Sequence, residues 1–83
     1  MYKVYNQLYV YGEEFENFND ATNKLYRLLE DSYKYNVPYN RVNSYSITNN
    51  IKTVTIKAEE FSAYISFDGK EKLLNDIKEK LGE

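Results

Sequence analysis

The chain has 83 residues, with 11 basic and 13 acidic side chains and a formal net charge of -2. This length predicts one small domain, spanning residues 1–83. A domain of this size buries a modest share of its surface, so self-association stays open. The absence of Cys and His excludes disulfides, thiol chemistry, Ser-His and Cys-His catalysis, and the commonest metal ligand.

The distribution of charge bears on partners and location. The small net charge, with no basic block and no acidic tail, disfavours nucleic acid as a partner. No signal-peptide pattern and no membrane-length apolar run is present, so we expect a cytoplasmic protein without a membrane partner. Ten Tyr residues, no Trp and many Asn and Lys residues are typical of AT-rich genomes, such as those of low-GC bacteria and their phages.

The N-terminal residues 2–11 alternate between apolar and polar positions, which predicts extended structure. Typical strand lengths favour one long strand with a bend or bulge near Asn6 and Gln7. The alternative makes Asn6 and Gln7 the turn of a short hairpin. An acidic connection from Gly12 to Glu16 follows.

Residues 17–20 resemble the start of a helix. Asn17 is the predicted N-cap, and Asp20 follows three residues later. Apolar residues then recur at helical spacing. Pro38 disfavours helical backbone at the preceding residue, so the helix is expected to end near residues 35–36 and to be followed by a link over residues 37–42.

Residues 43–67 predict three antiparallel strands in a meander. Asn49 and Asn50 lie between β-forming segments and suit a two-residue turn, because Asn tolerates the positive φ that such turns need. This turn pairs Tyr45 with Val54. Side chains alternate between the faces of a strand, so the pairing also decides which residues are buried.

A second turn, at Glu59 and Glu60, completes the predicted meander and pairs Val54 with Ile65. Two Glu residues are poor turn formers, which makes this the weakest part of the prediction. Both registers nevertheless collect the same apolar residues on one face. These are Tyr45, Ile47, Val54, Ile56, Ala58, Phe61, Ala63, Ile65 and Phe67.

The last element is a predicted helix with Asp68 as N-cap and Glu71 at the third position, the strongest capping-box pattern in the chain. Gly82 is a natural stop. The resulting order, β-α-β-β-β-α, predicts an α+β fold. It is a two-layer sandwich in which a mostly antiparallel four-stranded sheet carries both helices on one face.

Two surfaces are candidate binding sites. The uncovered face of the sheet gathers Tyr and Thr side chains, and Tyr combines a large contact area with a hydroxyl group. The acidic connection could mimic phosphates. The predicted binding residues are Tyr5, Tyr9, Tyr11, Thr53, Thr55, Tyr64, Glu13, Glu14 and Glu16. The plainer interpretation is that these are good strand formers on an exposed face and solvated loop charges.

No catalytic residue, metal site or cofactor is predicted, because the chain has no Gly-rich phosphate loop and no spaced set of metal ligands. We therefore expect a non-enzymatic interaction domain that binds another protein through exposed strands and acidic loops. One form is a phage or mobile-element inhibitor of a host or defence enzyme, as anti-CRISPR and anti-restriction proteins are. The alternatives are a nucleic-acid or nucleotide binder that stacks its ligand on Tyr rings as a homodimer, and a self-assembling subunit.

Overall fold

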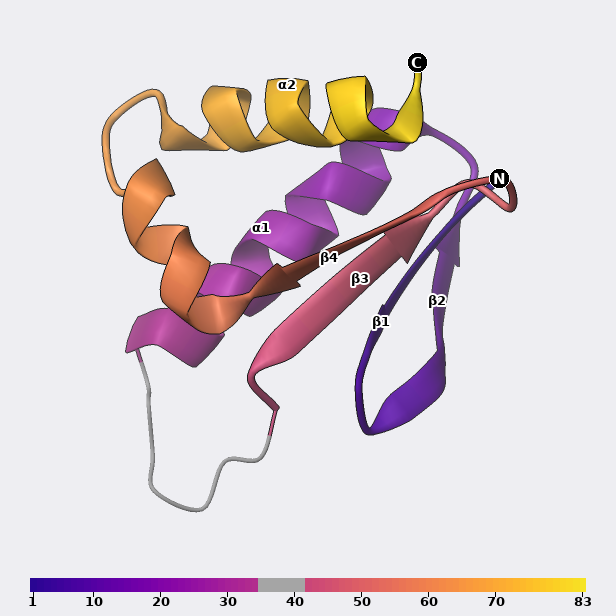
Figure 1. The fold of residues 1–83 in the computed structure, drawn as a ribbon, viewed down its shortest axis with the longest axis horizontal. Coiled ribbons are helices and arrows are strands. Elements are labelled where there is room, and N and C mark those ends of the chain that lie inside the picture. The colour runs from indigo at the N-terminus through magenta and orange to yellow at the C-terminus, as the bar shows by residue number, and fades with distance from the viewer. Residues whose placement is uncertain (35–41) are drawn as a thin grey trace.

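The computed structural model describes residues 1–34 and 42–83. Its elements are β1 (Tyr2–Asn6), β2 (Tyr9–Phe15), α1 (Phe18–Lys34), β3 (Ser44–Thr48), β4 (Thr53–Lys57), the 3-10 helix η1 (Ala58–Tyr64) and α2 (Gly69–Leu81). The four strands form one antiparallel sheet in the order β2-β1-β3-β4 (Figure 1). The predicted α+β class is confirmed, and the order of the elements differs from the predicted order in two places.

The hydrophobic core lies between one face of the sheet and the helices. The sheet contributes alternate residues of β1, β3 and β4, because alternate side chains point to the same face. Helices α1 and α2 contribute residues at helical spacing, and η1 contributes one ring. The buried apolar residues are Val4, Ala21, Leu25, Leu29, Tyr45, Ile47, Val54, Ile56, Phe61, Leu73, Ile77 and Leu81. Both helices therefore cover the same face, which makes a two-layer sandwich (Figure 1).

The first difference is at the N-terminus. The prediction of a single long strand is wrong there, and the alternative prediction of a hairpin is confirmed. Strands β1 and β2 pair with each other, and their turn lies at Gln7 and Leu8, one residue later than predicted. The Asn6 side chain explains this turn. Its Oδ1 accepts hydrogen bonds from the backbone N–H groups of Leu8 and Tyr9, both at 2.8 Å. A short polar side chain that bonds the backbone two residues later is a turn-forming device.

The second difference is the third strand of the meander, which is not formed. The chain after β4 turns into η1, and only one of the four apolar residues expected there from position 61 onward is buried. That residue is Phe61, whose ring packs edge-on against Tyr26 with 5.1 Å between ring centroids. Ile65 and Phe67 are exposed. The short helix η1 therefore brings one large ring to the core without the tight turn that two Glu residues disfavour.

The β3–β4 pairing differs from the predicted register by two residues. Tyr45 lies opposite Ile56 rather than Val54, and the connection takes up residues 49–52. Asn49 Oδ1 accepts hydrogen bonds from the N–H groups of Ile51 at 3.0 Å and Lys52 at 2.8 Å. Asn50 adopts the expected positive φ, 74°. A shift of two keeps every side chain on its predicted face, so the apolar residues of these two strands are buried as expected.

Helix α1 begins as predicted. Asn17 Oδ1 accepts a hydrogen bond from the Asp20 N–H at 2.8 Å, and Asn17 Nδ2 donates to the Asp20 carboxylate at 2.9 Å. The first bond confirms Asn17 as the N-cap, and the second joins the two side chains, whereas a full capping box would use the Asn17 backbone N–H. The helix is described as far as Lys34. Its predicted end at residues 35–36 and all but the last residue of the predicted link at residues 37–42 lie outside the described residues.

Helix α2 keeps the predicted C-terminus and the predicted N-cap position, Asp68, but not the predicted capping bond. Asp68 makes no side-chain capping bond and instead accepts a hydrogen bond from Ser66 Oγ at 2.7 Å, which lowers the pKa of its carboxyl group. Gly82 ends the helix at φ 79°. The Gly82 N–H bonds the Glu79 carbonyl and the next N–H bonds the Lys78 carbonyl, which is a Schellman motif.

Candidate interaction surface

The structure divides the predicted binding residues among four places. Tyr64 lies in η1, and Thr53 and Thr55 lie on β4 at one edge of the sheet. Tyr5 lies on β1, inside the sheet. The remaining residues come together on β2, at the other edge, and just after it. These are Tyr9, Tyr11, Glu13, Glu14 and Glu16.

Tyr64 is not part of any sheet surface, contrary to the predicted third strand. Its hydroxyl donates a hydrogen bond to the Asp76 carboxylate on α2 at 2.7 Å. Burial, this hydrogen bond, and the negative charges of Asp76 and Glu60 raise the pKa of Tyr64 to about 12. The side chain therefore joins η1 to α2, and we assign it a structural role.

Thr53 and Thr55 are exposed on the face of the sheet that the helices leave uncovered. The Thr55 hydroxyl forms a 2.7 Å hydrogen bond with the Ser46 hydroxyl on β3. This pair supports the β3–β4 ladder in the usual manner of cross-strand side chains. Strands β1 and β3 separate these Thr residues from β2, so they do not form one surface with Tyr9 and Tyr11.

A bulge in β2 brings its backbone close to Tyr5. The register of the β1–β2 ladder changes between Val4, which lies opposite Glu13, and Asn6, which lies opposite Tyr9. Gly12 occupies the bulge at φ 59°. A Cβ atom there would lie 2.3 Å from the Val4 carbonyl oxygen. Only glycine fits this conformation and this spacing without strain.

Strand β2 has one side that is unpaired in the described part of the chain, and it carries the most exposed aromatic pair of the hairpin. Among the described residues, β2 pairs with β1 alone, so its other side is a free edge. Tyr9 is 58% exposed and Tyr11 is 77% exposed, with 5.7 Å between their ring centroids. Leu8, at the turn, is also exposed. The name "β2 edge" is used below for β2 together with Glu16.

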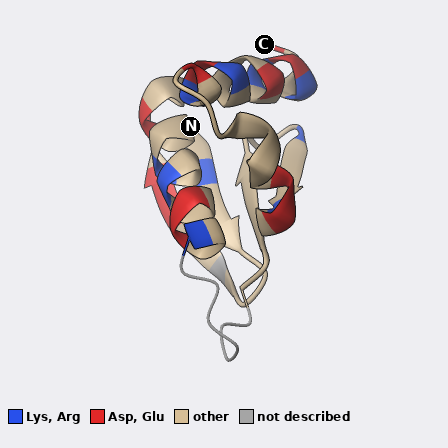
Figure 2. Cartoon of the chain, turned by 90° about the vertical axis from the view of Figure 1, so that its left-hand side faces the viewer, with Lys and Arg blue, Asp and Glu red and all other residues tan. Residues whose placement is uncertain are grey.

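The carboxylates of the β2 edge are only partly compensated. Glu13 lies 3.9 Å from Lys24 of α1, measured between Oε1 and Nζ. Glu14 and Glu16 are exposed and have no ion-pair partner within 4.0 Å in the described part of the chain. Lys3 faces Glu14 in the ladder, but its ammonium group lies 5.2 Å from the Tyr5 ring centroid. By contrast, acidic and basic residues are interspersed along α2 (Figure 2).

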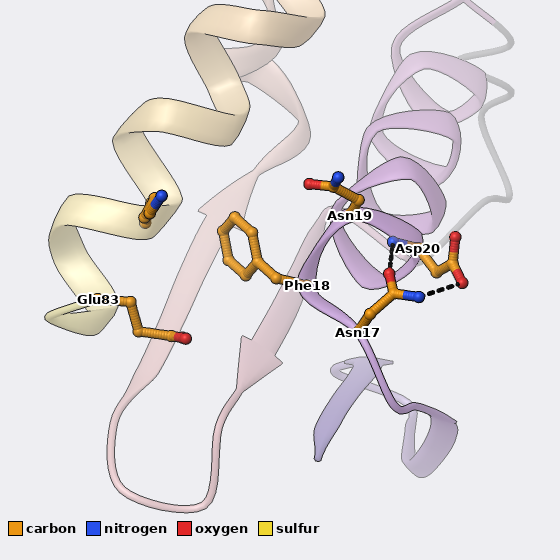
Figure 3. A pocket seen from close by; sticks show the side chains of 6 residues that line it. Asn17, Phe18, Asn19, Asp20 and Glu83 are labelled. Atoms are coloured by element: carbon orange, nitrogen blue, oxygen red, sulfur yellow. Dashed lines mark hydrogen bonds between the residues drawn. The ribbon is translucent and has the colours of Figure 1, made fainter.

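A shallow pocket lies where the start of α1 meets the end of α2 (Figure 3). Its volume is about 490 Å³, it is open to solvent, and it is lined by Asn17, Phe18, Asn19, Asp20, Lys78 and Glu83. Asn17 is bonded to Asp20, as the dashed lines in Figure 3 show. This lining holds one cation, Lys78, and two carboxylates, Asp20 and Glu83, so its net charge does not favour an anion.

Sequence reasoning did not find the most exposed ring of the described chain. Phe67, between η1 and α2, is fully exposed (104%), and Ile65 next to it is also exposed. Their alternation with Tyr64 and Ser66 predicts that Ile65 and Phe67 share the apolar face of a strand. The signal against that interpretation was the Glu59-Glu60 pair, which does not suit a tight turn.

The chain was compared with protein-family models, with curated proteins and with solved structures. None of the three comparisons gives a match. Neither described α-helix is long and apolar enough to span a membrane. In the described ranges, no group of three or more acidic side chains is placed to hold a metal ion. Function therefore has to be inferred from the geometry and charge of the surface.

Proposed function

We propose that this protein is a non-enzymatic interaction domain that binds another protein through the β2 edge. One observation carries the proposal: β2, whose second side is unpaired among the described residues, holds two exposed Tyr rings and the exposed carboxylate of Glu14, which makes no ion pair within 4.0 Å there. An unpaired strand edge is a ready template for another chain. Exposed Tyr rings are enriched where proteins meet, because they bury a large area at little entropic cost.

The more specific form of the proposal is a phage or mobile-element inhibitor of a host or defence enzyme. Its support is compositional, since the high Tyr and Asn content and the short chain suit an AT-rich accessory genome. Acidic side chains on the β2 edge suit a target with a basic surface. The same carboxylates repel phosphates, so they favour a protein over a nucleic acid as the partner of this edge.

The first test is an affinity pull-down from the native host lysate, followed by mass spectrometry. The test variant is Glu14→Lys with Glu16→Lys, since neither side chain makes an ion pair within the described residues. The control is Glu71→Lys with Glu79→Lys, which changes the net charge equally on exposed positions of α2. Glu13 is left unchanged because it pairs with Lys24.

We expect the wild type and the α2 control to retain one protein at near-stoichiometric yield. The β2-edge variant should retain at most about a tenth as much, because reversing two rim charges replaces attraction with repulsion. Equal retention by both variants would place the contact elsewhere and contradict the proposal. Recovery of nucleic acid in place of a protein would contradict it as well.

A further inference from the structure

We infer that the β2 edge takes an extended, Lys- or Arg-bearing segment of another protein, which adds to the sheet as a fifth strand beside β2. This inference rests on the proposed function and specifies the chemistry of its partner. Addition of a strand to a sheet edge is a common mode of peptide recognition. Main-chain hydrogen bonds supply affinity, and alternate side chains supply specificity.

The backbone of β2 offers a regular template at its second half. Residues 13–15 lie in unbroken register with β1: Glu13 opposite Val4, Glu14 opposite Lys3, and Phe15 opposite Tyr2. In such a ladder, part of the backbone N–H and C=O groups point away from the paired neighbour. The described chain places no further strand on that side. An incoming strand would pair there without displacing any existing strand.

The negative charges on this strand favour positively charged side chains on an incoming strand. Glu14 and Glu16 lie two residues apart, have no ion-pair partner in the described part of the chain, and are exposed. A side chain directly opposite on an added strand would lie about 5 Å away, which is the separation at which opposite charges stabilise a pair of strands. A segment with Lys or Arg at alternate positions meets this requirement.

The aromatic part of the edge points to the same class of partner. The rings of Tyr9 and Tyr11 are exposed and 5.7 Å apart, and the negative face of a tyrosine ring attracts an ammonium or guanidinium group. The chain already makes one contact of this type, with Lys3 Nζ 5.2 Å from the centroid of the Tyr5 ring. Two independent features, carboxylates and rings, therefore favour a cation.

The same features disfavour a second copy of this chain as the occupant. Two β2 strands paired about a two-fold axis would bring the carboxylates of Glu13 and Glu14 from both copies to the same short ladder. Like charges in neighbouring strands destabilise their pairing.

The test is a nuclear magnetic resonance titration of the full chain with synthetic peptides of about seven residues, a length that spans one strand. The first peptide alternates Lys with Val. The second replaces every Lys with Glu, and the third keeps the Lys residues but has Pro at its central positions, which prevents strand pairing. We expect the Lys-Val peptide to shift the backbone amide signals of residues 9–16 and to slow amide exchange in β2. Its affinity should exceed that of either control by about tenfold.

Glu14→Lys with Glu16→Lys should reverse the preference between the Lys and Glu peptides. Equal affinity for the Lys-Val and the Pro-containing peptides would show attraction without strand addition and overturn the inference. So would shifts centred on α2 or η1, or no binding of the Lys-Val peptide. The pull-down distinguishes these results from a failure of the proposed function. If a partner is retained and its retention depends on the β2 edge, the proposed function is supported and only the addition of a fifth strand is contradicted.

Discussion

The hydroxyl of Tyr64 lies 2.7 Å from a carboxylate oxygen of Asp76 and joins the end of η1 to the middle of α2. The connection between these two helices is also tight at Gly69, the first residue of α2. A Cβ atom at Gly69 would lie 1.6 Å from the Tyr64 carbonyl oxygen. The chain thus reverses from η1 into α2 around Tyr64. The sequence predicts Tyr64 on the open face of the sheet, whereas its hydroxyl bonds α2. Substitution of Tyr64 is therefore expected to change the stability of the fold, not binding to a partner.

Replacing Tyr64 with Phe should lower the free energy of unfolding by about 1.5 kcal/mol near pH 8, the low end of the usual range for a hydrogen bond to a charged acceptor, because the bond is only part-buried. The pKa of Tyr64 is raised from 10.0 to about 12, so its contribution is complete below pH 10 and is lost as the pH rises towards 12. Urea unfolding at increasing pH should therefore show the wild type and Tyr64→Phe converging above pH 10. Tyr11→Phe, at an exposed ring, should change nothing; a Tyr64 effect that stays constant with pH would contradict the assigned bond.

Phe61 and Phe67 give a matched pair for the region that was predicted as a strand. Phe61 is 2% exposed and its ring lies 5.1 Å from Tyr26 and 5.9 Å from Tyr33, whereas Phe67 is fully exposed. Phe61→Ala should cost about 3–5 kcal/mol of unfolding free energy, and Phe67→Ala less than about 0.5 kcal/mol. A three-stranded meander would bury both rings. Similar losses in both variants, measured by urea unfolding, would favour that meander over η1.

The faces of β3 and β4 could be predicted from the sequence even though their register could not. Alternation decides which side of a strand is apolar, and an error of two residues leaves alternation unchanged. The error itself came from the length of the turn. Asn49 bonds two backbone N–H groups through its side chain, which favours a four-residue connection over a two-residue one.

The sequence did not determine the β1–β2 hairpin or the β2 edge as it determined the faces of β3 and β4. Alternation over residues 2–11 is equally consistent with one strand or two, and the choice depends on which amide groups Asn6 bonds. The strand order, which makes β2 an edge, depends on long-range pairing of β1 with β3. The sequence identified the residues Tyr9, Tyr11, Glu13, Glu14 and Glu16, and the topology brought them to one edge.

Gly12 should tolerate substitution far less than Gly82, although both have positive φ. A Cβ at Gly12 would lie 2.3 Å from the Val4 carbonyl oxygen, which is backbone and cannot move alone. At Gly82 the nearest atom would be Lys52 Nζ at 3.3 Å, the end of a flexible side chain. Gly82→Ala should cost about 1 kcal/mol and Gly12→Ala clearly more, because strain adds to the unfavourable φ. Equal losses in thermal unfolding would show that the β1–β2 bulge is not as close as described.

Asn17 and Asp68 test which helix start depends on a side-chain cap. The sequence favours Asp68, but Asn17 is the residue whose side chain bonds the helix, through the Asp20 N–H at 2.8 Å and the Asp20 carboxylate at 2.9 Å. Asn17→Ala should lower the free energy of unfolding by about 1 kcal/mol, the usual cost of losing an N-cap. Asp68→Ala removes a bond to Ser66 and a 3.6 Å ion pair with Lys72, both at the surface, and should cost less. Urea unfolding of both variants in parallel measures the difference. A larger loss for Asp68→Ala would mean that Asp68 caps α2 in solution, as its capping-box pattern predicts.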